Sequence, residues 1–345
     1  MRQAIILKCR PNSRFHLGET TEVRSNTLTD TSTYIHSDVL FSAFLCQMSL
    51  LYPNKIDTFI QYFQNKDLAI SSAFYCLEHI ATKEKIFFLP KPLSLNLADV
   101  RKDDGNSLHK QLKKIQFISW KVWQEQLLPE QWLNTNFCYL IQDTFVVHKD
   151  EIKKSNELRE LTIFRKDDST KICLHTQEEE GNLYTQTDLF LIGNAYYNVH
   201  WYFFCQTNVS QADEAVFWQV WENLVQAGIG GERSTGAGQM LAIEKTDLPP
   251  FFSLSSEQKV ALSLIFPQEQ DLAQLLLYQS KLRGGMFLAD NYRLKVIQAV
   301  LEGAIHTGVE GKIATLHNQE TDGIRLRNGM AFSVPLPEKY LFKNN

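Results

Sequence analysis

Several features that define common protein classes are missing from this 345-residue sequence. The six cysteines lie thirty residues or more apart and form no CxxC pair, which disfavours a disulfide framework and a zinc site and predicts reduced thiols. The N-terminal apolar run covers only Ala4 to Leu7, too short for a signal-peptide core. No window approaches the roughly 18 apolar residues of a membrane span. We therefore expect a cytoplasmic protein with no membrane partner.

A surplus of positive charge is also missing. The net charge is −4, with 44% hydrophobic and 21% charged residues, which is ordinary for a globular protein. This balance argues against a protein that wraps nucleic acid over most of its surface. A local basic groove, or a binding surface shared with partners, remains compatible with it.

Catalytic and metal signatures are absent. The sequence has no GxSxG, HExxH, EF-hand or kinase motif, and none of its nine histidines pairs with another at metal-ligand spacing. We predict no cofactor, no metal and no catalytic residue. His16 and His36 lie beside small polar or basic residues, and a histidine near a phosphate can act as a general acid in RNA cleavage. We favour histidines that only form hydrogen bonds, because spacing fixes no second catalytic base.

One segment has an unusual composition. Residues 228–238, GIGGERSTGAG, contain five of the sixteen glycines. It follows a helical pattern and precedes a strand-like one, whereas phosphate-loop and Rossmann sites need strand, loop and then helix. Ala237 stands at the Walker lysine position, and Arg233 stands at the third glycine of the dinucleotide fingerprint. We predict a loop whose backbone N–H groups converge on a phosphate. A helix C-cap at Gly228 followed by a tight turn is the alternative, and it explains one or two of the glycines.

Strands and helices interleave without a regular parallel rhythm, which predicts an α+β fold. Pro249-Pro250 predicts a domain boundary, and the length suits two domains. The patterns predict a helix capped by Ser37 and running to Leu51, a helix after Ser210 that ends at Gly228, a projecting basic hairpin in 151–176 with a turn at 167–169, and a helix over 271–280.

Lysines alternate with aromatic residues between Leu108 and Leu128. Such a stretch can bind single-stranded RNA by stacking and charge. It is more often the amphipathic surface of a helix with solvated lysines, and we prefer that interpretation.

Several segments, in this order, resemble one protein family. The glycine loop 228–238 resembles the signature of the RAMP superfamily, the RNA-binding proteins of CRISPR systems. Within it, the segments are similar to the Csm subunit that caps the 5′ end of the guide in type III-A complexes. They span nearly the whole chain and are SRFHLGE at 13–19, IHSDVLFSA at 35–43, FLPKP at 88–92, KKI at 113–115 and AFSVP at 331–335.

The resemblance implies two ferredoxin-like (RRM-like) βαββαβ domains, residues 1–247 and 248–345. The first would carry insertions, including a thumb hairpin at 151–176, and the glycine loop. The resemblance implies a non-catalytic subunit that binds the crRNA 5′ handle. It would join the large polymerase-nuclease subunit to the backbone RAMP subunit and meet target RNA through the complex. The loop departs from the family pattern at Glu232 and Ala237, where basic and bulky apolar residues are frequent.

The handle-binding residues expected from this resemblance and from phosphate chemistry are Arg14, Phe15, His16, His36, Ser37, Gly228, Gly230, Gly231, Arg233, Ser234, Thr235, Gly236 and Gly238. One alternative is a crRNA-processing endoribonuclease of the same superfamily, using His16 or His36. Another is a small-ligand phosphate binder, which the missing Walker lysine disfavours.

Overall fold

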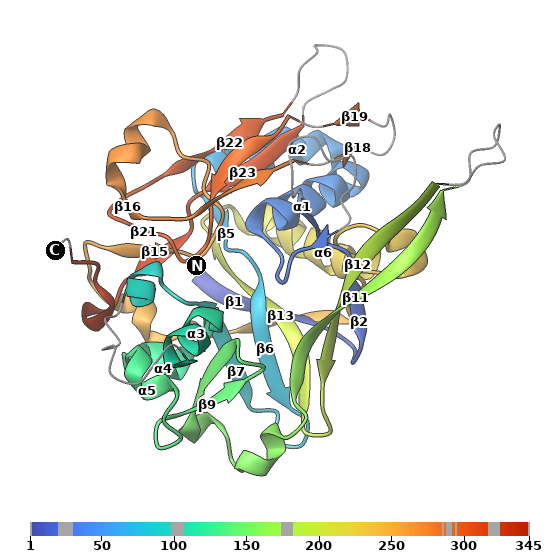
Figure 1. The fold of residues 1–345 in the computed structure, drawn as a ribbon. Helices are drawn as coiled ribbons and strands as arrows, with labels where there is room; N and C mark the ends of the chain where they lie inside the picture. Colours follow the sequence, from blue (N-terminus) through green and yellow to red (C-terminus); the bar gives the residue numbers. More distant parts are fainter. Residues whose placement is uncertain are drawn as a thin grey trace.

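The structure is a computed structural model of the chain. It confirms the α+β prediction, because a large sheet carries a few helices (Figure 1). In the part of the chain that it describes, no helix is both long and apolar enough to cross a membrane. The described residues are 2–19, 30–97, 107–173, 182–284, 286–287, 292–293, 295–316 and 325–343.

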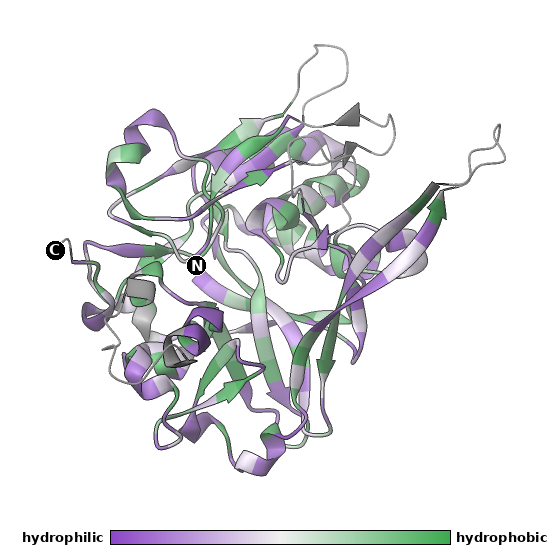
Figure 2. Ribbon diagram, viewed as in Figure 1, coloured by the Kyte–Doolittle hydropathy of each residue, from purple (hydrophilic) through white to green (hydrophobic). Residues whose placement is uncertain are grey.

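The main sheet has nine strands in the order β14-β1-β13-β6-β7-β8-β10-β9, with β5 also paired to β13. β6 and β13 are almost entirely buried, as expected for strands covered on both faces. Figure 2 shows hydrophobic stretches interrupted by hydrophilic residues along the strands of this sheet. The strands are β1 (Arg2–Lys8), β5 (Leu68–Ile70), β6 (Phe74–His79), β7 (Lys85–Pro90), β8 (Phe117–Ser119), β9 (Cys138–Ile141), β10 (Phe145–His148), β13 (Tyr197–Thr207) and β14 (Ala242–Thr246).

Two helices pack together beside the β14-β1-β13-β6 part of this sheet. They are α1 (Ser37–Leu51), which follows β1, and α6 (Gln211–Ala227), which joins β13 to β14. Phe44 of α1 contacts Phe217 and Trp221 of α6 at 5.2 and 5.8 Å between ring centroids, and Trp221 lies 4.6 Å from Phe203 of β13. The β1–β13, β1–β14 and β13–β6 pairs are all antiparallel. The six elements therefore follow the chain order β-α-β-β-α-β.

A long hairpin extends from the body (Figure 1). Its strands are β11 (Thr162–Cys173) and β12 (Asn182–Gly193), and β2 (Ser13–Phe15) pairs with the base of β12. The turn predicted at residues 167–169 is wrong, because β11 runs straight through these residues. Asp168 faces Thr187 across the ladder, and the hydroxyl of Thr187 donates to the Asp168 carboxylate at 2.7 Å. The basic segment therefore supplies one strand of the hairpin, and residues 182–193 supply the other.

A helical layer covers the other end of the main sheet. It lies between β7 and β10 in the sequence and at the lower left of Figure 1. Its aromatic side chains face inward: Trp123 is fully buried, and Trp120 stacks on Phe87 with 4.1 Å between ring centroids. The helices beyond α1 and α6 are α2 (Ile56–Gln64), α3 (Ser107–Lys114), α4 (Trp120–Gln124) and α5 (Pro129–Trp132).

The described residues after 248 form strands and 3-10 helices. The helix predicted over 271–280 is wrong: a 3-10 helix at Glu269–Gln274 leads into β16, and Asp271 is buried with its carboxylate accepting the N–H groups of Glu310 and Gly311 at 3.0 Å. The strands are β15 (Lys259–Ala261), β16 (Leu275–Leu277), β17 (Ser280–Arg283), β18 (Met286–Phe287), β19 (Tyr292–Arg293), β20 (Ile297–Val300), β21 (Ile305–His306), β22 (Gly311–Thr315), β23 (Leu326–Met330) and β24 (Ser333–Pro335).

The expected second βαββαβ unit needs two α-helices. The described residues of 248–345 supply none, only 3-10 helices, so this division of the chain stays a prediction. Two short strands, β3 (Gly18–Glu19) and β4 (Asp30–Thr31), pair near the start of α1.

Candidate functional site

The glycine loop lies against the segment around β2. The Gly231 N–H donates to the carbonyl of His16 at 2.8 Å, and the Gly238 N–H donates to the carbonyl of Arg14 at 2.7 Å. Gly228 ends α6 with a positive φ of 85°, where a residue with a Cβ would be strained. The predicted helix stop at Gly228 is therefore confirmed, and the loop is hydrogen-bonded to β2 and to His16.

Close backbone contacts explain most of the glycines. A Cβ on Gly238 would lie 2.0 Å from the Ile229 carbonyl oxygen, and a Cβ on Gly230 would lie 2.5 Å from that of His16. One on Gly231 would lie 2.9 Å from the His16 ring. Gly236 differs: its φ is +84°, yet a Cβ there would meet nothing within 4 Å. Gly236 is thus the loop glycine that borders open space.

More of the loop N–H groups form hydrogen bonds within the protein than the predicted phosphate loop requires. The N–H groups of residues 228, 229, 231 and 235–238 all donate to carbonyl oxygens of the protein itself. Within the described residues, the N–H groups of Gly230 and of 232–234 donate to no protein acceptor. Any ligand of the loop therefore meets three consecutive amides, at 232–234, rather than the whole row.

Side chains join the loop to the hairpin. Arg14 donates to the Thr235 hydroxyl at 2.5 Å and lies 3.6 Å from the Asp188 carboxylate of β12. His16 Nδ1 is 3.0 Å from the Thr187 carbonyl, so this nitrogen carries the proton and donates. Lys171 of β11 pairs with Glu232 at 2.9 Å and holds the pKa of that carboxyl below its usual value. Ala237, the other departure from the family pattern, is fully buried.

Two arginines remain uncommitted at this surface. The side chains of Arg10 and Arg233 are exposed and have no ion pair or hydrogen bond within the described residues. A groove of about 380 Å³ runs beside the loop and is lined by Arg10, Arg14 and Gly236, among others. Sequence reasoning missed Arg10, although its place before the Pro11-Asn12 turn and near Arg14 was a usable signal. We call this surface the glycine platform; it comprises residues 10–14, His16 and residues 232–236.

Phe15 does not belong to this surface. Its side chain is fully buried and packs edge-on against Trp201 at 5.7 Å. No ring face is left for a base to stack on, so the expectation that Phe15 binds RNA is wrong. Alternation along the strand explains this, since Arg14 points outward and Phe15 inward.

His36 and Ser37 are also interior. His36 is 3% exposed, with Nδ1 2.9 Å from Glu302 and Nε2 3.3 Å from the Ser32 hydroxyl. Ser37 is the first helical residue rather than the N-cap, which is His36. Its N–H donates to Ser72 at 2.8 Å and its hydroxyl accepts from the Leu264 N–H at 3.1 Å. The prediction of these two residues as RNA contacts is therefore corrected: the protein itself occupies the start of α1.

A buried charge cluster explains why α1 begins in the interior. Asp38 is 1% exposed and contacts Arg283 of β17 at 3.0 Å and Arg327 of β23 at 2.8 Å. Burial alone would raise the pKa of Asp38, but the two guanidinium groups outweigh it and lower the pKa to about 2. We call Asp38, Arg283 and Arg327 the α1 seam, because they join α1 to the C-terminal strands.

One group of side chains has metal-ligand composition. Glu125, His148 and Asp150 place potential ligand atoms within 4.8 Å of one another. His148 contacts Glu125 at 3.0 Å, and the ammonium of Lys121 lies 2.9 Å from Asp150. Burial is the main cause that lowers the pKa of His148. The ammonium of Lys121 thus already offsets one of the two carboxylates of this cluster.

Comparisons with known proteins place the chain. No protein-family model matches it. A chain in the crystal structure of a Csm3–Csm4 subcomplex of a type III-A CRISPR–Cas interference complex has a TM-score of 0.65 at 21% identity, over 97% of this chain and 99% of that one. A chain in the crystal structure of a Csm1–Csm4 cassette in complex with cA4 gives 0.58 at 15% identity, over 98% and 100%. The chain therefore has the fold of subunits found in type III-A CRISPR assemblies.

The sequence comparison narrows the class of protein further. The CRISPR system protein Csm4 of Methanocaldococcus jannaschii is 26% identical over 336 residues, which cover 87% of this chain and 85% of that protein. The chain is Csm4-like in sequence and in fold, and the predicted resemblance is confirmed.

Proposed function

We propose that this protein is a non-catalytic subunit of a type III-A Csm complex that binds the 5′ handle of the crRNA through its glycine platform. The likeness to Csm4 extends along most of both chains. The observation that carries the proposal is a surface with two uncommitted arginines, beside three consecutive amides and an open glycine. Phosphate groups are bound by this combination of guanidinium and backbone donors.

The domain assignment belongs to the same proposal. We assign β1, α1, β6, β13, α6 and β14 to a ferredoxin-like unit within residues 1–247, because their chain order and antiparallel sheet order suit that fold. The elements between β6 and β13 are then insertions. Among them, the β11–β12 hairpin is the candidate for the thumb, and its two strands are tied to the glycine platform through Lys171 of β11 and Asp188 of β12.

The proposed partners of this chain are those found in the solved assemblies that contain the similar chains. Those structures contain Csm3 or Csm1 together with Csm4. We propose that this chain links a large polymerase-nuclease subunit to the first backbone RAMP subunit, and that it meets target RNA only within the complex. Its net charge of −4 suits such sharing, because neighbouring subunits supply the remaining positive charge around the RNA.

The direct test is the crRNA content of reconstituted complexes carrying Arg233→Ala. Loss of a charge-assisted phosphate contact should weaken handle binding by about tenfold and deplete crRNA from the complex. Arg159→Ala is the matched control, since Arg159 is exposed, lies outside the platform and has no side-chain partner within the described residues. Equal and normal crRNA content in both variants would contradict the proposal.

The endoribonuclease alternative is narrowed by geometry. Both ring nitrogens of His36 are bonded in the interior, so it is unavailable to a substrate. His16 keeps Nε2 without a partner among the described residues and remains the one candidate of the two. Repeat RNA incubated with the purified protein without metal should stay intact. Cleavage that His16→Ala abolishes would support the enzyme and contradict the non-catalytic assignment.

A further inference from the structure

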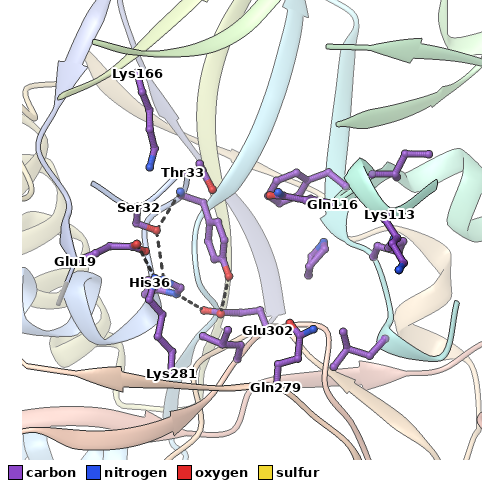
Figure 3. A pocket seen from close by; sticks show the side chains of 17 residues that line it. Glu19, Ser32, Thr33, His36, Lys113, Gln116, Lys166, Gln279, Lys281 and Glu302 are labelled. Carbon is purple, nitrogen blue, oxygen red and sulfur yellow. Dashed lines mark hydrogen bonds and ion pairs between the residues drawn. The ribbon is translucent and has the colours of Figure 1, made fainter. Parts of the chain in front are cut away.

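A second cleft lies apart from the glycine platform (Figure 3). Its volume is about 460 Å³, within the range of about 300–1,000 Å³ typical of small-ligand sites. The walls come from the α3–β8 segment, the end of β7, the loop before α1, β11 and the C-terminal residues around β17. Four lysines and two glutamates line it: Lys91, Lys113, Lys166, Lys281, Glu19 and Glu302.

Two of these lysines are already neutralised. Lys166 lies 3.0 Å from Asp30, and Lys281 lies 2.5 Å from Glu19. In Figure 3 these two side chains approach the cleft from different sides, with Glu19 close to Lys281. They frame the cleft but contribute little net charge to it.

The opposite wall carries charge that has no counter-ion. Lys91 is 9% exposed, and its ammonium donates to the Leu112 carbonyl at 3.0 Å without a carboxylate partner among the described residues. Burial lowers the pKa of Lys91 to about 8, which reflects the absence of a compensating anion. Leu112 directly precedes Lys113, and Lys91 and Lys113 both line the cleft. Lys113 is exposed and likewise has no partner within the described part of the chain.

The carboxylate of Glu302, which lines the cleft, already has hydrogen-bond partners in the protein. Glu302 accepts hydrogen bonds from His36, Tyr34 and Ser72, and those to His36 and Tyr34 are both 2.9 Å. Its carboxylate is therefore already satisfied. The amides of Gln116 and Gln279 border the cleft in Figure 3, and neither side chain has a hydrogen-bond partner among the described residues. The available groups are thus two ammonium ions and two amides.

We propose that this cleft binds one phosphorylated nucleotide, with the phosphate at Lys91 and Lys113 and the base edge at Gln116 and Gln279. Ammonium groups bind phosphate, and an amide offers both a donor and an acceptor to a base edge. The ligand is either a free mononucleotide or one nucleotide of an RNA strand, since the recognised chemistry is the same.

The cleft and the glycine platform are separate sites. β11 carries Lys166 to the cleft and Lys171 to Glu232 of the glycine loop. These lysines are five positions apart on a strand, so they point to opposite faces. The cleft proposal therefore goes beyond handle binding at the platform and can fail independently of it.

Calorimetric titration of the purified full chain tests this inference. The two probes are adenosine 5′-monophosphate and a 5′-phosphorylated single-stranded RNA octamer, compared across Lys113→Ala, Gln116→Ala and Lys114→Ala. Lys114 is the matched control, because it is the next residue of the same helix, is exposed and pairs with Asp143 at 3.3 Å. The cleft predicts binding about tenfold weaker in Lys113→Ala and nearly unchanged in Lys114→Ala.

The probe that binds identifies the source. Lys113-dependent binding of the mononucleotide supports a free ligand, and Lys113-dependent binding of the octamer alone supports a nucleotide of a strand. Arg233→Ala should leave mononucleotide binding unchanged, which separates this test from that of the glycine platform. Binding of neither probe, or equal losses in the Lys113 and Lys114 variants, would overturn the inference.

Discussion

The glycine platform and the start of α1 look alike in sequence but are opposite in structure. Each combines a histidine with small polar residues near the end of a helix. At the platform these are His16 and the loop residues around Arg233, and at α1 they are residues 36–38. At the platform, Arg10 and Arg233 are exposed and uncommitted. At α1, His36, Ser37 and Asp38 are all buried, and their side chains contact residues of the protein itself.

The difference shows that contacts with residues far away in the sequence determine the role of a local motif. The start of α1 contacts Leu264, Arg283, Glu302 and Arg327, all from the C-terminal part of the chain. The same N–H groups and small side chains that could bind a phosphate instead join two regions of the fold. The comparison therefore predicts stability effects at α1 and ligand effects at the platform.

The largest stability effect is expected for Asp38→Asn. Removing this carboxylate leaves Arg283 and Arg327 buried without their counter-ion, which should cost about 3–5 kcal/mol of unfolding free energy. Asp57→Asn is the control, since Asp57 is an exposed acid in the first turn of α2 and should change stability by less than about 1 kcal/mol. Urea unfolding of both variants measures the difference, and similar losses would contradict the α1 seam.

Acid should weaken the same contact. The folded-state pKa of Asp38, lowered from 3.8 to about 2, means that its contribution is complete above the ordinary value and is lost as pH falls from about 4 to about 2. Wild type should therefore lose more unfolding free energy than Asp38→Asn over this interval. Parallel pH profiles of the two proteins would contradict the assignment.

Within the glycine loop, Gly238→Ala should be far more damaging than Gly236→Ala. The new Cβ at Gly238 would lie 2.0 Å from the Ile229 carbonyl, which should cost about 3 kcal/mol together with its positive φ. Gly236 has open space, so only the backbone strain of about 1 kcal/mol applies. Thermal unfolding compares the two variants, and equal losses of stability would contradict the difference in space around Gly236 and Gly238.

The smallest stability effect is expected for Glu232→Gln, which removes the partly exposed pair with Lys171. Such pairs contribute up to about 1 kcal/mol. Because the change also removes a negative charge beside Arg233, RNA affinity should rise modestly, and more so at low salt. Filter binding at two salt concentrations measures this. Weaker RNA binding would place the phosphate path elsewhere.

Local signals in the sequence predicted the elements that local interactions determine. The helix after Ser210 is an example: the Ser210 hydroxyl accepts the Asp213 N–H, and Gly228 ends the helix. The sequence also grouped Arg14 and His16 with the glycine loop, and these residues contact it in the structure, whereas RNA binding by this surface stays a prediction. The turn at 167–169 was wrong because its polar residues are typical of turns, yet here they occupy a long exposed hairpin and bond across it.

Long-range contacts account for the remaining errors. His36, Ser37 and Phe15 gained their burial from residues such as Glu302, Leu264 and Trp201, which lie 186 or more positions away in the chain. The helix predicted over 271–280 failed because Leu275–Leu277 pair with β21. The periodicity of the sequence does not predict pairings between distant segments. A single histidine in the sequence also gives no sign of whether its side chain faces solvent or Glu302.

The central claim is that the crRNA handle lies on the glycine platform, and photo-crosslinking tests it most directly. A reconstituted complex is assembled on crRNA with a photoreactive nucleotide in the 5′ handle, irradiated and digested, and the crosslinked peptides of this subunit are sequenced. Our account predicts crosslinks at residues 10–14, at His16 and at residues 232–236. Handle crosslinks confined to other parts of this chain, or found only on other subunits, would contradict it.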